Sequence, residues 1–259
     1  MRSLVLALIV VSLAGAGCGS NDNTTPTSPS GGGGAFTESF ASTIKTGGTV
    51  FYSFVMGGTN VNQPANLFIT LASVTNTATG AVVTGITPRL GLGVPSGTGC
   101  ALSQSVLAAP ALTAQLSAFV APGTYCVSIA DTGGITADSD FMIRITQGAL
   151  IMTSTPSPQT FASNLSVKGT SVQTFAIAGG TGVGQVTATL NSVSPVKTIG
   201  FAIGVWRPDN STCSVTAATT SAGGATFSLP INQGTYCIKV SDPGTLTDVV
   251  AFSVGIIHP

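Results

Sequence analysis

Charged side chains are scarce in this chain. Of its 259 residues, 6% are charged, against about 25% in an average soluble domain. The eight basic residues are scattered singly, whereas binding to nucleic acid or to an acidic membrane surface requires clustered Lys and Arg. The composition therefore argues against a nucleic-acid partner, and it predicts a surface covered by hydroxyl groups and backbone.

Residues that carry catalytic chemistry are equally few. The one histidine, His258, precedes the final residue, so we expect it at a frayed terminus, which is a poor place for a Ser/His/Asp triad. Glu38 is the only glutamate, which leaves little for a paired-carboxylate mechanism. The glycine-rich residues 180–184 lie between predicted strands with no helix after them, which favours a hairpin turn over a phosphate loop. We expect no enzymatic activity and no obligatory cofactor.

Helix patterns are absent, and strand patterns are frequent. Short alternating segments are separated by turn formers such as Ala-Pro-Gly at residues 121–123, which is typical of antiparallel sandwiches. The predicted strands cover residues 50–55, 67–74, 89–94, 112–119, 124–130, 141–146, 172–177, 186–193, 199–206, 225–230, 235–241 and 249–256.

The two halves of this series repeat one another. Gly-Thr-Tyr-Cys at residues 123–126 returns at residues 234–237, and Phe-Met-Ile-Arg-Ile at 141–145 aligns with Phe-Ser-Val-Gly-Ile at 252–256. The order of matching segments is kept, which indicates duplication of a whole domain. The sequence predicts an all-β protein: two tandem antiparallel β-sandwich (jelly-roll-like) domains after a signal peptide and flexible linker. We place the first repeat at residues 36–147, a Pro-containing linker at 148–160 and the second repeat at 161–257. The linker is either a stiff connector or a segment docked between the domains.

The cysteines divide into one pair per repeat and one remaining residue. We expect disulfides between Cys100 and Cys126 and between Cys213 and Cys237, which leaves Cys18 to be explained. Arg2, an apolar run too short to span a bilayer and small residues precede Cys18, which resembles a bacterial lipoprotein signal. Residues 1–17 are then the signal peptide, and Cys18 takes the lipid that anchors the protein to the membrane. Gly15 departs from the usual aliphatic residue of that pattern, so an ordinary signal peptidase and a soluble secreted protein form the alternative.

Residues 18–35 contain Ser, Thr, Pro, Asn and a run of glycines with almost no apolar side chain. Such a segment gains little from burial, so we expect a flexible tether. The expected location is extracytoplasmic, on the bacterial outer membrane or cell surface.

Acidic residues gather in one loop of each repeat. Carboxylates and loop carbonyls are the ligands that calcium prefers, so these loops are candidate calcium sites. The alternative is that the first aspartate of each loop starts a turn by accepting hydrogen bonds from its own backbone. The residues concerned are Asp131, Asp138 and Asp140 in the first repeat and Asp242 and Asp248 in the second.

The single tryptophan lies beside polar residues in the second repeat. Trp206 is followed by Arg207 and Asp209, and an aromatic face with polar neighbours is suited to a sugar or peptide ligand. The alternative is that Trp206 caps the core over the Cys213–Cys237 bridge. Tyr125 and Tyr236 occupy matching positions in the two repeats, which favours a packing role.

The strand order, with Pro-Gly-Thr-Tyr or Gln-Gly-Thr-Tyr leading into a strand that ends near an aspartate, resembles the bacterial pre-peptidase C-terminal domain. This chain differs in placing cysteine directly after the tyrosine and in carrying no peptidase domain. The resemblance implies a β-sandwich with an accessory or binding role. We expect a cell-envelope lipoprotein that binds a polysaccharide or a surface protein, with a self-associating surface component or an accessory subunit of a secreted enzyme as alternatives.

Overall fold

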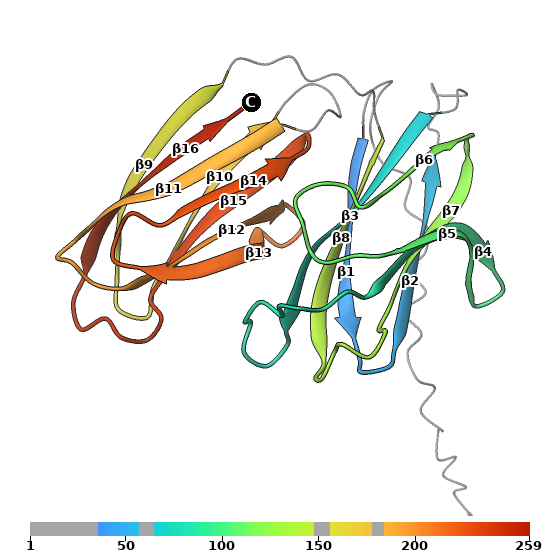
Figure 1. The fold of residues 1–259 in the computed structure, drawn as a ribbon, viewed down its shortest axis with the longest axis horizontal. Helices are drawn as coiled ribbons and strands as arrows, with labels where there is room; N and C mark the ends of the chain where they lie inside the picture. The colour runs from blue at the N-terminus through green and yellow to red at the C-terminus, as the bar shows by residue number, and fades with distance from the viewer. Residues whose placement is uncertain (1–35, 57–64, 148–155, 178–183) are drawn as a thin grey trace, which may run out of the picture.

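The structure is a computed structural model that describes residues 36–56, 65–147, 156–177 and 184–259. These residues form sixteen strands and no helix, so none of them builds a helix that could cross a bilayer. The strands make four antiparallel sheets of four strands each, stacked as two β-sandwiches (Figure 1). The predicted signal peptide, Cys18 and the tether lie outside the described residues.

Sandwich 1 contains strands β1–β8, in sheets ordered β1-β8-β3-β6 and β2-β7-β4-β5. Its strands are β1 (Phe36–Ile44), β2 (Thr49–Met56), β3 (Ala65–Asn76), β4 (Arg89–Ser96), β5 (Gly99–Leu107), β6 (Leu116–Val120), β7 (Gly123–Ala130) and β8 (Ser139–Gln147).

Sandwich 2 contains strands β9–β16 and repeats the same two orders, β9-β16-β11-β14 and β10-β15-β12-β13. Its strands are β9 (Ser157–Leu165), β10 (Thr170–Ile177), β11 (Gly184–Ser194), β12 (Ile199–Arg207), β13 (Thr212–Ser221), β14 (Thr226–Ile231), β15 (Gly234–Ser241) and β16 (Val250–His258). Eight strands in two four-stranded sheets with this connectivity form a jelly roll, so the predicted tandem all-β fold is confirmed.

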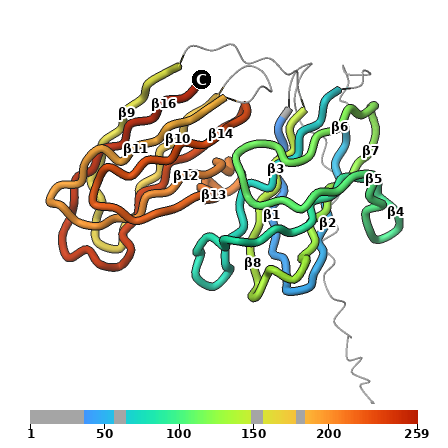
Figure 2. The backbone as a smooth tube through the Cα atoms, viewed as in Figure 1, coloured from blue at the N-terminus to red at the C-terminus, as the bar shows by residue number. Residues whose placement is uncertain are grey.

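The last strand of each sandwich shows how the two are joined. Along β16 buried residues alternate with more exposed ones, as expected of a strand with one face on a core. Along β8 almost every residue is buried, because sandwich 2 covers the outer face of the sheet that contains β8. Figure 2 shows β12 and β13 of sandwich 2 on the side that faces sandwich 1.

Apolar and polar contacts both hold this junction. Ala72, Leu112 and Met142 of sandwich 1 belong to the same buried cluster as the core of sandwich 2. The Thr216 hydroxyl donates a hydrogen bond to the Ala72 carbonyl at 2.6 Å, and the Ala114 N–H donates to Asn232 Oδ1 at 2.9 Å. The core of sandwich 2 therefore extends across the junction to these three residues, while sandwich 1 keeps a separate core of its own.

The face that sandwich 2 covers differs from its counterpart in the second repeat. Thr70 faces Arg144 in the β3–β8 pair, and the matching β11–β16 pair is Thr189 with Gly255. The same comparison matches the buried Met142 with Ser253, and the bulge residue Ala72 with the exposed Asn191. We call the residues Ala72, Met142 and Arg144 the docking face. The second repeat carries polar or small residues at all three positions.

Several elements differ from the sequence predictions. Four strands were not predicted, β1, β5, β9 and β13, because their mostly polar or exposed residues show little alternation. The strand predicted over residues 112–119 begins only at Leu116, which pairs with Ile69. Just before it, the Gln115 side chain bonds the backbone of Leu71. β9 begins at Ser157, inside the predicted linker.

The predicted fraying of His258 is wrong. His258 ends β16, is buried, and stacks on Phe175 with ring centroids 5.4 Å apart. Its Nε2 also lies 3.0 Å from the Gln159 side-chain nitrogen, so the ring is held between β9 and β10.

Candidate ligand-binding pocket between the sandwiches

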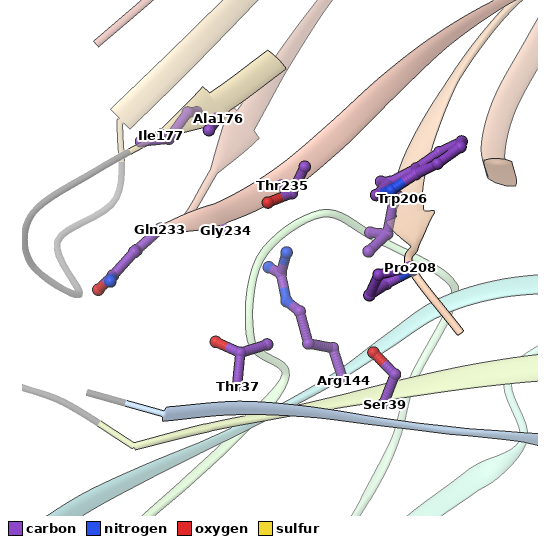
Figure 3. Close-up of a pocket in the computed structure, with 11 residues that line it drawn as sticks. Thr37, Ser39, Arg144, Ala176, Ile177, Trp206, Pro208, Gln233, Gly234 and Thr235 are labelled. Carbon is purple, nitrogen blue, oxygen red and sulfur yellow. The ribbon is translucent and has the colours of Figure 1, made fainter. Parts of the chain in front are cut away.

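A pocket of about 560 Å³ lies where the two sandwiches meet. Sandwich 1 contributes Thr37 and Ser39 from β1 and Arg144 from β8. Figure 3 shows Arg144 extending from its strand toward Gly234 and Thr235 of β15, with Trp206 and Pro208 on the neighbouring side. The pocket lining consists of Thr37, Ser39, Arg144, Ala176, Ile177, Val205, Trp206, Pro208, Gln233, Gly234 and Thr235.

Arg144 is the most unusual residue of this lining. It lies opposite Ser39 and Thr70 on neighbouring strands, so its side chain leaves the outer face of sandwich 1. It is 2% exposed. Its Nη2 donates to the Tyr236 hydroxyl at 2.7 Å and to the Leu112 carbonyl at 3.2 Å. Nε and Nη1 are buried and have no hydrogen-bond partner among the described residues.

The charge of Arg144 also lacks a carboxylate partner. Among the described residues, the one ion pair within 4 Å joins Arg207 to Asp209, so none of their carboxylates lies that close to the Arg144 guanidinium. The guanidinium carbon lies 4.8 Å from the centre of the Tyr236 ring, a cation–π contact that stabilises the charge in part. A buried cation is normally paired or fully hydrogen-bonded, and Arg144 is neither.

Tyr236 connects this arginine to the core of sandwich 2. Its ring stacks on Phe175 at 5.7 Å, and its hydroxyl donates to the Asn232 carbonyl at 2.6 Å. Burial raises the pKa of the Tyr236 phenol, and the nearby Arg144 charge opposes that shift. Tyr125 makes the matching bond in sandwich 1, to the Ala121 carbonyl at 2.8 Å. Both repeats therefore use their tyrosine to fix the turn before it, and only Tyr236 also contacts the arginine.

The turn before β15 forms one wall of the pocket. Gln233 Oε1 is buried and has no hydrogen-bond partner among the described residues. Gly234, with φ of +148°, lies against the guanidinium, and a Cβ at this position would come within 2.5 Å of Arg144 Nη1. Only glycine fits this close approach.

The three residues predicted to contact ligand do not form one cluster. Trp206 lines the pocket, is half-buried, and pairs with Cys213 across the β12–β13 ladder. Arg207 lines a second, polar hollow of about 180 Å³. It also forms an ion pair with Asp209 at 2.7 Å, and this hydrogen bond lowers the pKa of Asp209.

The aspartates act as turn anchors in both sandwiches. Asp131 accepts hydrogen bonds from the backbone N–H groups of residues 133–135 and from that of Gly47. Asp242 does the same with residues 244–246 and Lys168. These hydrogen bonds lower the pKa of both carboxyls. The largest effect comes from the Gly47 N–H on Asp131 and from the Lys168 N–H on Asp242. Each aspartate thus ties its own loop to the turn that joins the first two strands of its sandwich, β1 to β2 or β9 to β10.

The other acidic residues lie apart from these anchors. Asp140 accepts bonds from the hydroxyls of Thr43 and Thr77, and Asp248 accepts one from Thr247. Asp138 accepts a hydrogen bond through its backbone carbonyl, from the Thr77 N–H. Across the described residues, no group of three or more metal-ligating side chains comes together. Calcium binding stays a prediction.

Both predicted disulfides are present, Cys100–Cys126 and Cys213–Cys237. Each joins the edge strand of a sheet to a central strand, and Cys126 and Cys237 are fully buried. Disulfides form and persist in oxidising compartments. The two bridges therefore indicate an extracytoplasmic protein.

Comparisons with known proteins give little beyond this geometry. No family model and no curated protein matches the chain. The solved structures that are similar include one described as a triple jelly-roll fold and turret assembly in an archaeal virus and one described as Sulfolobus turreted icosahedral virus. They are 13% and 14% identical, with TM-scores of 0.30 and 0.29. Each match covers 84% of this chain and 58% of the viral chain, so this chain spans little more than half of the viral chain's length. Similarity at this level carries no functional argument, and the fold assignment rests on the strand order.

Proposed function

We propose that this protein is a non-catalytic cell-envelope lipoprotein that binds a polysaccharide in the pocket between its two jelly rolls. The observation that carries the proposal is the placement of Trp206 in a pocket with the polar side chains of Thr37, Ser39, Gln233 and Thr235. An indole provides a flat face for a sugar ring, and hydroxyl and amide groups orient the ligand through hydrogen bonds.

The size of the pocket favours a glycan over a folded protein as the ligand. Its volume of about 560 Å³ falls within the range of about 300–1,000 Å³ that is usual for small-molecule sites. A stable protein–protein interface needs a broad surface of about 800 Å² on each partner. A few sugar units of a longer chain match a pocket of this kind.

The cellular setting is part of the same proposal. Lipidation at Cys18 would tether the sandwiches to the membrane through residues 18–35, and the disulfides agree with an exported protein. The resemblance to the pre-peptidase C-terminal domain remains a hypothesis, and it implies a binding or accessory role of the same kind.

The experiment is a calorimetric titration of the mature chain, made soluble by Cys18→Ser, with a panel of neutral and acidic oligosaccharides. We expect at least one to bind, and we expect Trp206→Ala to weaken that binding about tenfold or more, which corresponds to about 1.4 kcal/mol. Phe119→Ala is the matched control, because Phe119 is 70% exposed on β6 and does not line the pocket. If no oligosaccharide binds, or if the two variants behave alike, the proposal is wrong.

Self-association is a second candidate function, favoured by strand β5. β5 forms a free edge of its sheet, carries no charged residue, and exposes Leu102 and Leu107. Uncharged exposed edges are templates for pairing with another chain. Light scattering should then show a concentration-dependent dimer that Leu107→Lys abolishes, while a monomer at all concentrations excludes this function. Co-purification with a secreted enzyme would instead support an accessory subunit.

A further inference from the structure

We infer that the polysaccharide is acidic and that Arg144 binds its anionic group. This inference rests on the proposed function and gives the chemical class of the ligand: a glycan that carries a carboxylate, phosphate or sulfate.

The charge of Arg144 is the first observation. A guanidinium that is 2% exposed has lost nearly all of its hydration, which costs several kcal/mol unless a partner replaces the water. The contacts described above are neutral: a hydroxyl, a carbonyl and an aromatic ring. A ligand anion supplies the opposite charge that the described residues do not provide.

The unused hydrogen-bonding groups are the second observation. Arginine has five N–H donors, and Nη2 uses its two on Tyr236 and Leu112. The N–H of Nε and the two of Nη1 remain without a partner among the described residues. Gln233 Oε1, on the wall of the same pocket, is a buried acceptor that also has no hydrogen-bond partner among the described residues. Unused donors on a cation and an unused neutral acceptor fit a ligand with an anionic group and a hydroxyl group, and a sugar acid has both.

The repeat comparison shows that the fold itself does not require this arginine. The matching position in sandwich 2 is Gly255, in the same register opposite Thr189. The same jelly-roll strand therefore forms with no side chain at this point. Of the two matching strands, β8 lines the pocket and carries the arginine, while β16 does neither, which ties the arginine to the junction and not to the sandwich.

Access to Arg144 runs through the turn that precedes β15. Gly234 stands against Nη1, so the inferred contact requires the Gln233–Gly234 turn, which Tyr236 holds through the Asn232 carbonyl, to shift when the ligand binds. A free salt ion gains few contacts from that movement, whereas a sugar acid also gains those with Trp206 and Gln233. The pocket therefore discriminates between a free anion and an anionic glycan.

The test titrates the full mature chain with trigalacturonate, with its methyl ester, with a sulfated trisaccharide and with inorganic phosphate, following the fluorescence of Trp206. We expect trigalacturonate or the sulfated trisaccharide to bind at least about 30-fold more tightly than the neutral ester. The arm that binds identifies the anion as carboxylate or sulfate. Phosphate alone should bind weakly, and equal affinity for it would overturn the inference.

Arg144→Met should remove the preference, so that acid and ester bind equally. Arg89→Met is the matched control, because Arg89 is exposed on β4, outside this pocket. If Arg144→Met does not fold, the comparison of acid with ester on the wild-type chain still decides, because it needs no variant. Equal binding of acid and ester, lost in Trp206→Ala, would overturn the inference and leave the proposed function standing. Absence of all glycan binding would overturn both.

Discussion

The contact between Tyr236 and Arg144 offers the sharpest test of how the two sandwiches are coupled. Tyr236→Phe removes one hydroxyl, which donates to the Asn232 carbonyl and accepts from Arg144. A neutral hydrogen bond contributes about 1 kcal/mol and one to a charged group about 1.5–3 kcal/mol. Because Tyr236 is fully buried, water cannot replace either bond. We therefore expect the free energy of unfolding to fall by about 2.5–4 kcal/mol.

Tyr125→Phe is the internal control. The Tyr125 hydroxyl makes the same bond to the carbonyl four residues earlier, in the same fold, but Tyr125 is partly exposed and contacts no arginine. Its loss should cost about 1 kcal/mol or less. The difference between the two variants reports on the deeper burial of Tyr236 together with its contact to Arg144 across the junction.

The assay is urea unfolding, followed by far-UV circular dichroism and by the fluorescence of Trp206, which reports on sandwich 2 beside the junction. A double-mutant cycle with Arg144→Met should give a coupling energy of about 1.5–3 kcal/mol, in the range measured for residues in direct contact. Equal costs for the two tyrosine variants, with no coupling in the cycle, would refute the view that Arg144 and Tyr236 hold the sandwiches together.

Three further predictions follow from the chain's other anchors. Removing either disulfide, by Cys126→Ala or Cys237→Ala in the oxidised protein, should lower the free energy of unfolding by about 3.5 kcal/mol, since the bridges close loops with sequence separations of 26 and 24 residues. Equal urea midpoints for the oxidised wild-type protein and these variants would contradict this. The pKa values of Asp131 and Asp242 are lowered in the folded state, so their contribution is present above about pH 4 and is lost as pH falls through the folded pKa. Asp131→Asn or Asp242→Asn should reduce the fall in the free energy of unfolding between neutral pH and pH 2. If both variants lose stability with falling pH as the wild type does, the anchoring role is excluded. Intact-mass measurement of the protein from its native membrane should give a diacylated or triacylated chain that starts at Cys18, whereas an unlipidated chain would exclude the anchor.

The fold could be predicted from the sequence because duplication displays every strong element twice. Gly-Thr-Tyr-Cys marks the matching strands β7 and β15 in the two halves. The last strand of each half, β8 or β16, is recognisable from its Phe-x-x-x-Ile sequence. Four of the eight edge strands, β1, β5, β9 and β13, were missed because they lack that signal. The β5 residues are exposed almost throughout, so no apolar period distinguishes them from a loop.

The pocket could be predicted only in part. Trp206 is recognisable because it is the one tryptophan and is followed by polar residues. Arg144 was missed, although a signal was present: it is the one charged residue within the predicted apolar strand over residues 141–146, and it aligns with a glycine in the other repeat. What the sequence does not show is which face of β8 another domain covers. Alternation predicts that Arg144 leaves the core of its own sandwich, and only the packing of sandwich 2 buries it.

The unequal docking faces decide how many modules can be stacked. Sandwich 2 packs on sandwich 1 head to tail, with different surfaces on the two partners, and such a contact generates an open-ended array when every unit carries both surfaces. In sandwich 2, Asn191, Ser253 and Gly255 replace the apolar and cationic residues that receive the next module. Hydrated polar groups gain little from burial, so this face of sandwich 2 is unsuited to receive another module in the same way. Placing Ala, Met and Arg there would be the first step toward a fibre-forming variant.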